Sequence, residues 1–493
     1  MRPSEIPKGL ITVLKQVQEF AASQNVECFL VGGFLRDQLL GRAVLHWNVD
    51  LAVAKGAIGL ARDLAAHLKG AFVPLDEQWG CARIVIGGTP GLELDISDFR
   101  GSTLEEDLHR RDFTINALAI RLQEWLKDPR SLLNLVDPLH GRLALERQQL
   151  IACFKDSFVE DPVRILRALR FQAQLNFSLD AATLSLIKQA ASLLAQVSGE
   201  RIRDELVLIL QTRRCYEAVQ SLNALGVLDI LFPELVPGRG MVQGGVHHLD
   251  VLGHQIETLA YADRVLDGFE DFSEMFRAPL RDYCAMPMVE GRSRLALIKL
   301  AGLVHDVGKP ANRQVHADGE IWFIGHEHTG AELAIGIVDR LRLSNRESQM
   351  ICRIVKHHLR PGLLSREPQL TRRAIYRFYK DLQDDGPACL LTWWHDRLAA
   401  RGSASRLDQL DQQRARLEEM LHPYFFKVEE VVRPPRLVDG HQLMQTLGLA
   451  AGPRIGDLLA AIEEAQAEGR VHSTQQALDF AREHLARGQS AHE

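Results

Sequence analysis

The sequence predicts an α+β protein in which a small mixed sheet near the N-terminus precedes a mostly α-helical body. Short apolar stretches bounded by glycine or polar residues recur through residues 1–150, a pattern typical of strands that alternate with helices. From about residue 157 onward, apolar residues recur at helical spacing almost to the end. No fixed-period repeat interrupts this order.

The first part of the chain supplies the predicted sheet. Residues 10–23 have the spacing of an amphipathic helix, and the stretch that follows is a buried strand ending at Gly32 and Gly33. Further along, strand and helix patterns alternate in the segments FLRDQLLG (helix), NVDLAVA (strand), GLARDLAAHLKG (helix), RIVIGG (strand) and LELDIS (strand). We expect four parts in the whole chain: 1–150, 151–240, 241–430 and 431–493.

Composition limits the class of protein. The 493 residues are 46% hydrophobic, which supports a large core without disulfides, and the seven cysteines form no CxxC pair. There is no signal-like start and no apolar run of ~18 residues, so we expect a soluble, cytoplasmic protein with no membrane segment. A net charge of −6 argues against indiscriminate coating of nucleic acid, although local basic patches still permit a nucleic-acid substrate.

The first chemical motif is the strand, glycine pair and helix around Gly32 and Gly33. Paired glycines let the backbone approach a ligand, and a helix N-terminus favours phosphate. Asn48 and Asp50 follow on a strand and share one face because they are two residues apart. Carboxylates at this spacing hold Mg²⁺ against a triphosphate. Either feature alone is more often structural; the combination is more specific.

A second motif, EDPVR, begins a predicted helix at Asp161. Arg164, Arg167 and Arg170 recur every three residues on one helix face. A carboxylate beside a guanidinium offers an acceptor and a fork of donors, which suits the Watson–Crick edge of C or A. The alternative is a capped helix with a solvated arginine face.

Histidine and aspartate residues cluster in five separated segments of the helical part. Imidazole and carboxylate together suit a transition metal that activates water against a phosphate ester. A single His-Asp pair is usually structural, whereas five segments favour a metal site. The candidates are His254, His305, Asp306, His326, His328, His357, His358 and Asp396.

The N-terminal motifs resemble those of the bacterial class II tRNA nucleotidyltransferase (CCA-adding) and poly(A) polymerase family. The matching segments, in order, are LVGGFLRDQLLG, NVDLAV, DLHRRDFTINALA, LVDPLHGRL and EDPVRILRALRF. The resemblance is close over 25–250 and looser beyond. It implies a polymerase-β-like nucleotidyltransferase head at 1–150, a nucleotide-reading neck at 151–240 and a tRNA-contacting tail at 431–493. It further implies Mg²⁺ as cofactor, and the tRNA 3′ end, CTP and ATP as partners.

The resemblance also implies roles for individual residues. Those that would cradle the triphosphate are Gly32, Gly33, Arg36 and Asp37. The two metal positions are Asn48 and Asp50, with Asp95 as a third carboxylate. Contacts to the sugar and phosphates would come from Arg110, Arg111, Asp112 and Asn116. The base would be read on the helix that carries Asp161, Arg164, Arg167 and Arg170.

Asn48 departs from the family pattern, which has aspartate there, and the preceding loop is two residues longer. The amide supplies no charge, so the affinity for Mg²⁺ and the rate should fall. Three explanations stay open: the head is weakened or inactive, His46, Asp50 and Asp95 recover the site, or the natural sequence carries a mutation. A specialist in adding C, adding A or making poly(A) is also compatible with these motifs.

The histidine segments resemble an HD-type phosphohydrolase domain, expected at 241–430. The resemblance implies core ligands at His254, His305, Asp306 and Asp396, and added ligands of a binuclear site at His326, His357 and His358. His328 is expected behind the ligands and Lys309 at the phosphate. Manganese, nickel or iron suits these ligands better than magnesium. The insertion at about 262–292 is either a lid or a disordered surface loop, with the loop favoured.

Overall fold

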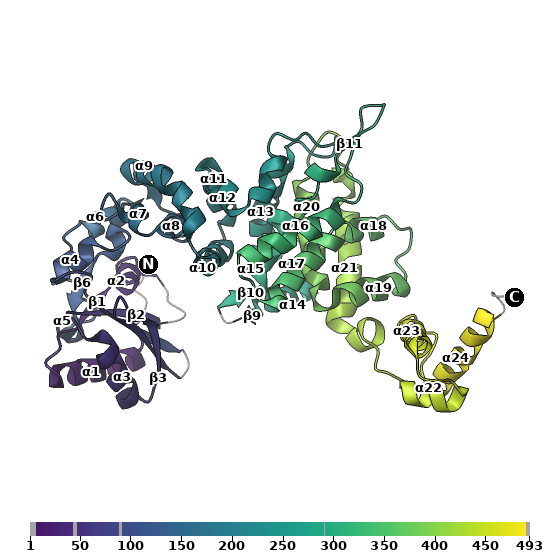
Figure 1. Ribbon diagram of the computed structural model, residues 1–493, viewed down its shortest axis with the longest axis horizontal. Coiled ribbons are helices and arrows are strands. Elements are labelled where there is room, and N and C mark those ends of the chain that lie inside the picture. The colour runs from purple at the N-terminus through teal and green to yellow at the C-terminus, as the bar shows by residue number, and fades with distance from the viewer. Residues whose placement is uncertain (1–5, 43–46, 88–90, 290, 490–493) are drawn as a thin grey trace. The chain divides into compact units, whose positions relative to one another are not determined.

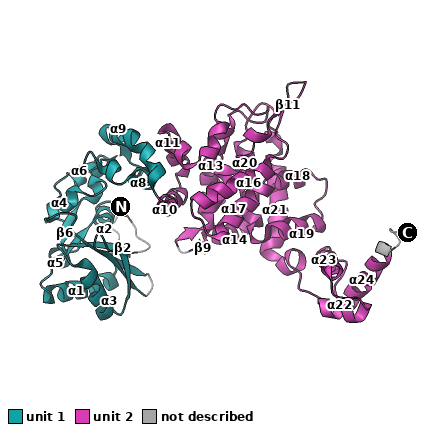
Figure 2. Cartoon of the chain, viewed as in Figure 1, with its two compact units in different colours: residues 1–197 teal, residues 198–493 magenta. Residues whose placement is uncertain are grey.

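The computed structural model describes residues 6–42, 47–87, 91–289 and 291–489. The chain divides into two compact units, Met1–Val197 and Ser198–Glu493 (Figure 2). The predicted neck, 151–240, is therefore shared: its first part belongs to the N-terminal unit and the remainder to the C-terminal unit.

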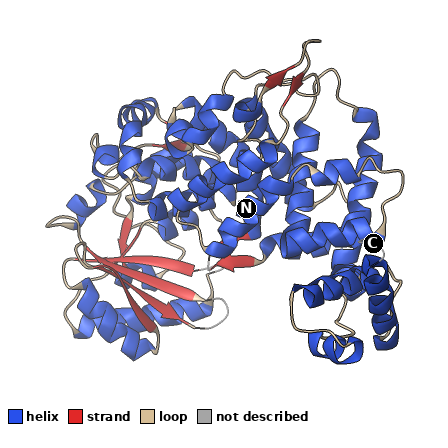
Figure 3. Cartoon of the chain, turned by 45° about the vertical axis from the view of Figure 1, so that its right-hand side comes forward, coloured by secondary structure: helices blue, strands red, loops and turns tan. Residues whose placement is uncertain are grey.

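The N-terminal unit is built on a six-stranded mixed sheet in the order β3-β4-β5-β2-β1-β6 (Figure 3). β2 and β5 run parallel, and the other neighbouring strands are antiparallel. The predicted small mixed sheet is confirmed. The strands are β1 Phe29–Val31, β2 Trp47–Val53, β3 Ala71–Asp76, β4 Cys81–Ile86, β5 Leu92–Asp98 and β6 Ala119–Arg121.

Helices cover one face of this sheet and leave the other for polar residues. α3 packs on β3, β4 and β5, with α1 beside it (Figure 1). On β2, Val49, Leu51 and Val53 are fully buried, so the alternate positions of the strand face the other way. The helices of this unit are α1 Lys8–Ser23, α2 Gly33–Leu39, α3 Ala57–Leu68, α4 Leu104–His109, η1 Thr114–Asn116, α5 Leu122–Lys127, α6 Gly141–Glu146, α7 Ser157–Glu160, α8 Arg164–Leu175, α9 Ala181–Ala190 and η2 Ala191–Gln196; β7 Gln149–Leu150 pairs with β8 Ser178–Leu179.

The C-terminal unit is helical, as expected, and its centre is formed by α13, α15 and α20, which pack against one another. Two short hairpins are β9 Pro287–Val289 with β10 Arg292–Ser293, and β11 Gln314–Val315 with β12 Ile321–Trp322. The helices are α10 Gly199–Leu210, α11 Cys215–Ala224, α12 Val227–Leu231, η3 Pro233–Gly238, α13 Val251–Gly268, α14 Glu274–Ala285, α15 Arg294–Val304, η4 Pro310–Asn312, α16 His326–Arg340, α17 Asn345–His357, α18 Arg360–Leu364, α19 Arg372–Leu382, η5 Gln383–Asp385, α20 Gly386–Ala399, η6 Leu407–Gln409, α21 Leu410–Phe426, η7 Val428–Val432, α22 Gly440–Leu447, α23 Pro453–Ala467 and α24 Thr474–Gln489.

The segment 262–292 differs from its prediction as a disordered surface loop. α13 continues to Gly268, and α14 follows with Phe276, Leu280 and Tyr283 buried. The acidic and Pro/Met-rich composition suggested a loop, but three apolar residues at spacings of three and four give α14 a buried face. That prediction is wrong.

The last helices, α22 to α24, share an apolar cluster that includes Leu443, Leu458 and Ile462. Glu464 on α23 pairs with Arg373 and Arg377 on α19, which ties this tail to the rest of its unit. All seven cysteines are free thiols. In the described part of the chain, no helix combines the length and apolar character needed to cross a membrane.

Candidate functional sites

The polar face of the sheet brings the predicted carboxylates together. Asp50 on β2 lies in register with Asp95 on β5, and Asn48 lies in register with Glu93. Alternation places all four on one face. Burial, followed by the charge of Asp95, raises the pKa of Asp50 to about 6. A carboxylate destabilised in this way favours a cation beside it.

A guanidinium that the sequence analysis did not identify lies across these carboxylates. Arg83 on β4 donates from Nε to Asp95 Oδ1 (2.7 Å) and from Nη2 to Asp95 Oδ2 (2.9 Å). Its Nη1 lies 2.7 Å from Glu93 Oε2. Asn48 Nδ2 lies 3.4 Å from the same Asp95 Oδ2. Alternation in CARIVI, with Ala82 and Ile84 buried, was the signal that placed Arg83 on the polar face.

The glycine turn touches the carboxylate face directly. Gly32 has φ +73°, and a Cβ there would lie 2.9 Å from Asp50 Oδ2. Only glycine accepts both this backbone conformation and this approach. Gly33 then begins α2, so the turn presents backbone N–H groups beside Asp50.

A hydrogen-bonded chain links the predicted nucleotide-binding residues. Arg36 pairs with Asp37 (2.9 Å) and donates to Asn116 Oδ1 (2.8 Å). Asn116 Nδ2 donates to Asp112 Oδ1 (3.0 Å), and Arg167 pairs with Asp112 Oδ2 (2.9 Å). Burial alone would raise the pKa of Asp112, but Arg167 and Asn116 hold it well below its ordinary value. This ionised, fully bonded network fixes both arginines.

The arginines at 110 and 111 are held by different partners. Arg111 makes an ion pair with Asp107 (2.8 Å), and its charge lowers the pKa of Asp50 against the effect of burial. The Arg110 side chain donates to the carbonyl of Arg100 (3.1 Å). Both lie on the α4-to-η1 segment that follows β5.

The EDPVR segment places its carboxylate and guanidinium side by side. Asp161 Oδ2 lies 3.9 Å from Arg164 Nε, and Arg164 also donates to Ser157 Oγ (2.9 Å). Arg164 is 8% exposed, so the alternative of a solvated arginine face does not describe it. α8 begins at Arg164, after Asp161 and Pro162. Arg170 lies over the ring of Phe171, 4.6 Å from its centroid. His46, which we considered as a compensating ligand, lies outside the described residues.

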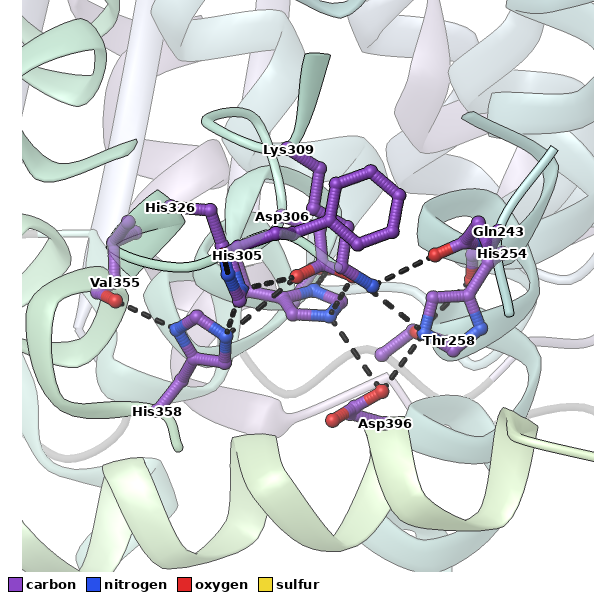
Figure 4. Close-up of polar contacts among 12 residues, drawn as sticks. Gln243, His254, Thr258, His305, Asp306, Lys309, His326, Val355, His358 and Asp396 are labelled. Carbon is purple, nitrogen blue, oxygen red and sulfur yellow. Dashed lines mark hydrogen bonds and ion pairs between the residues drawn. The ribbon is translucent and has the colours of Figure 1, made fainter. Parts of the chain in front are cut away.

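The second site is a group of buried histidines and aspartates in the helical unit (Figure 4). Two trios have ligand atoms within 4.8 Å of one another. The first is His254, His305 and Asp396; the second is Asp306, His326 and His358. They come from α13, the end of α15, α16, the end of α17 and α20. The structure thus gathers six of the predicted ligands.

Backbone hydrogen bonds hold three of the imidazoles ready to bind a cation. Nδ1 of His305, His326 and His358 contacts the carbonyl oxygens of Gly302 (2.8 Å), Phe323 (2.6 Å) and Val355 (2.7 Å). When Nδ1–H donates to a carbonyl, the Nε2 lone pair is free for a metal. All three Nε2 atoms lie within 3.6 Å of Asp306. This chemistry fits a transition metal.

Asp306 connects the two trios. Its Oδ2 lies 3.2 Å from His305 Nε2 and 2.6 Å from Lys309 Nζ, and its Oδ1 lies 3.2 Å from His326 Nε2. Burial would lower the pKa of His305, but Asp306 and Asp396 raise it to about 10. Lys309, predicted to meet the phosphate, is held between Asp306 and Gln243 Oε1 (2.7 Å).

Two predicted histidines do not join this group. His357 lies in neither trio, and His328 is 66% exposed beside Glu327. Helix geometry explains both: adjacent residues point about 100° apart, and residues two apart point to opposite sides. His358 and His326 face the centre, so their neighbours cannot. His357 therefore lies outside both trios, and His328, expected behind the ligands, is exposed.

One histidine beside this group, His247, was not predicted from the sequence. The ring of His247 lies 4.3 Å from that of His254, and burial lowers its pKa to about 3. The HH pair before α13 was the available signal.

Two glycines, Gly308 and Gly330, let α16 pack closely against the segment that follows α15. A Cβ on Gly308 would lie 2.1 Å from the carbonyl oxygen of His326 and 2.5 Å from the backbone nitrogen of Gly330.

These features define the class of protein: a mixed-sheet head with a carboxylate face and glycine turn, joined to a helical unit with a buried His/Asp cluster that could hold a metal. Four family descriptions match the chain. They are "Poly A polymerase head domain" over 28–151, "Probable RNA and SrmB- binding site of polymerase A" over 176–238, "HD domain" over 251–383 and "tRNA nucleotidyltransferase domain 2 putative" over 337–481.

Curated relatives match over nearly the full length. An A-adding tRNA nucleotidyltransferase of Deinococcus radiodurans is 36% identical, with 92% of this chain and 94% of the relative covered. A CC-adding tRNA nucleotidyltransferase of Thermus thermophilus is 32% identical, with 92% and 93% covered. The chain belongs to the bacterial tRNA nucleotidyltransferase family.

Solved structures of low identity share the fold. A CCA-adding enzyme in an apo form matches with a TM-score of 0.62 at 21% identity, with 96% of this chain and 94% of that chain covered. The Thermotoga maritima CCA-adding enzyme complexed with tRNA-CCA matches with a TM-score of 0.60 at 21% identity, covering 97% and 96%. The predicted fold, a polymerase head followed by a helical body with an HD domain, is confirmed.

Proposed function

We propose that this chain adds C, A or both to the 3′ end of tRNA, using CTP and ATP without a nucleic-acid template. The main support for this proposal is that Asp50 and Asp95 lie in register on one face of the sheet, beside the Gly32 turn. Full-length relatives named as A-adding and CC-adding enzymes support the same reaction class. With these substrates, we expect the enzyme to act in the cytoplasm.

The residues present fit a divalent cation at the head. Asp50 supplies a free carboxylate and Asn48 a carbonyl oxygen, both acceptable to Mg²⁺. When bound, Mg²⁺ neutralises the triphosphate and favours attack of the tRNA 3′-hydroxyl on the α-phosphorus, with loss of pyrophosphate. The Gly32 turn offers N–H groups to the phosphates. Asp161 and Arg164 present an acceptor and donors to the incoming base.

The second proposed activity belongs to the two trios that Asp306 connects. We infer a metal-dependent phosphohydrolase that acts on phosphate monoesters or 2′,3′-cyclic phosphates of RNA ends. Manganese, nickel or iron is the metal, because imidazole and carboxylate together suit these ions. The alternative, in which the head only binds RNA and hydrolysis is the sole activity, rests on Asn48.

Extension of truncated tRNA tests the transferase and the effect of Asn48. Purified protein is incubated with Mg²⁺, labelled CTP or ATP, and tRNAs that lack CCA, CA or A. We expect incorporation at one or more of these ends. The Asn48→Asp variant should be faster by roughly tenfold, because it adds an anionic ligand for Mg²⁺. If neither protein incorporates either nucleotide, the transferase proposal is wrong.

A further inference from the structure

Arg83 occupies a special position on the carboxylate face. It lies in register with Asp95 across β4 and β5. Its side chain therefore leaves the sheet on the same face as Asp50 and Asp95. Its fork engages both oxygens of Asp95, at 2.7 and 2.9 Å, in the bidentate geometry typical of strong arginine–carboxylate pairs. Its third nitrogen reaches Glu93 at 2.7 Å.

This arrangement changes the charge available to cations. Asn48 is neutral, and each carboxylate oxygen of Asp95 already accepts a hydrogen bond from Arg83. Among the described residues, Asp50 is therefore the one carboxylate of this face that forms no ion pair with an arginine. Two Mg²⁺ ions next to one guanidinium would need more negative charge than these side chains supply.

We propose that Arg83 is a built-in replacement for one of the two divalent cations, so that the head binds a single cation at Asp50. The inference rests on the proposed transferase function. A guanidinium stays charged at any physiological pH and needs no loading from solution. Arginine has five N–H donors. Three are directed at Asp95 and Glu93, which leaves two for a phosphate oxygen.

The competing explanation is a structural ion pair that only fastens β4 to β5. The two explanations differ in the number of cations that the head binds. If Arg83 replaces a cation, a neutral side chain at this position frees Asp95 and restores a second binding position. If it is structural, the count stays the same.

The number of cations is measured by electron paramagnetic resonance titration with Mn²⁺ and a non-hydrolysable CTP analogue. The full-length chain is used, with His254→Ala and Asp306→Ala to remove metal binding at the histidine centre. We expect one Mn²⁺ bound at the head of the parent protein. Arg83→Leu and Arg83→Gln should each bind two, and their affinity for the second Mn²⁺ should exceed any residual second binding in the parent by at least about tenfold.

Two variants serve as controls. Arg83→Lys keeps the positive charge and should still bind one Mn²⁺. Arg62→Leu removes an exposed arginine on α3 that lies over Phe72 and should change nothing. Circular dichroism checks folding, and Arg83→Gln, which retains hydrogen-bonding groups, provides the comparison if Arg83→Leu does not fold.

Two Mn²⁺ in the parent, none in the parent, or one in both neutral variants would each overturn the inference. The measurement does not depend on nucleotide transfer. Absence of tRNA extension together with a count that changes from one to two refutes the proposed function and leaves the role of Arg83 standing.

Discussion

Replacing Asp50 with alanine is expected to slow nucleotide addition by about three orders of magnitude, the scale seen when one group that stabilises a transition state is removed. Asp50 is the carboxylate against which the Gly32 turn packs, and its neighbours on the face are a neutral Asn48 and an Asp95 held by Arg83. No adjacent side chain replaces its charge. Binding of the cation and of the triphosphate should weaken together.

The measurement is the rate of labelled nucleotide addition to truncated tRNA at saturating Mg²⁺. Asp63→Ala, which removes an exposed carboxylate from α3 of the same unit, is the matched control and should keep the parent rate. If Asp50→Ala retains more than about a tenth of the rate, the carboxylate face is not the centre of transfer.

The second large effect is expected at the histidine centre. Asp306→Ala should abolish metal-dependent phosphate release, with a loss of about three orders of magnitude, because Asp306 contacts both trios and anchors Lys309. The substitution also leaves a buried lysine without its partner carboxylate, so Asp306→Asn is made in parallel. Nucleotide addition in Mg²⁺ should stay within about twofold, because the transfer site has its own carboxylates.

Bound metal is counted by elemental analysis, and phosphate release from a monoester and from a 2′,3′-cyclic nucleotide is followed with Mn²⁺. His328→Ala is the control: this side chain is exposed, so its removal should keep both the metal and the rate. Parent-like metal content and hydrolysis in Asp306→Ala and Asp306→Asn would contradict the assignment of this centre.

Much of the head was predictable because side chains along a β-strand alternate between the two faces of the sheet every residue. Alternation alone placed Asn48 and Asp50 on one face, and the glycine pair predicted the close turn that the structure shows beside Asp50. The pairing of Asp50 with Asp95 depends on strand order, which no local pattern gives. Its recognition came from the resemblance to a known family.

The missed residues share a physical reason. Arg83 becomes a neighbour of Asp95 only through the β4–β5 register, and Glu93 becomes a neighbour of Asn48 only through the β2–β5 register. His357 looked equivalent to His358 in the sequence, yet the helix turns by about 100° between them. Side-chain direction at a helix end therefore decides which of two adjacent histidines is a candidate ligand.

The structure also sharpens the question raised by Asn48. Its amide faces Asp95 at 3.4 Å and lies in register with Glu93, and Arg83 on β4 pairs with both of these acids. We therefore infer an altered transferase site in which Asp50 carries the cation.

The most direct test is a crystal structure of the chain with a non-hydrolysable CTP analogue and Mn²⁺, in which anomalous scattering locates each cation. The expected result is Mn²⁺ bonded to a carboxylate oxygen of Asp50 and to the triphosphate. An anomalous map with Mn²⁺ only among the histidines, and none at Asp50 although the nucleotide is bound, would contradict it.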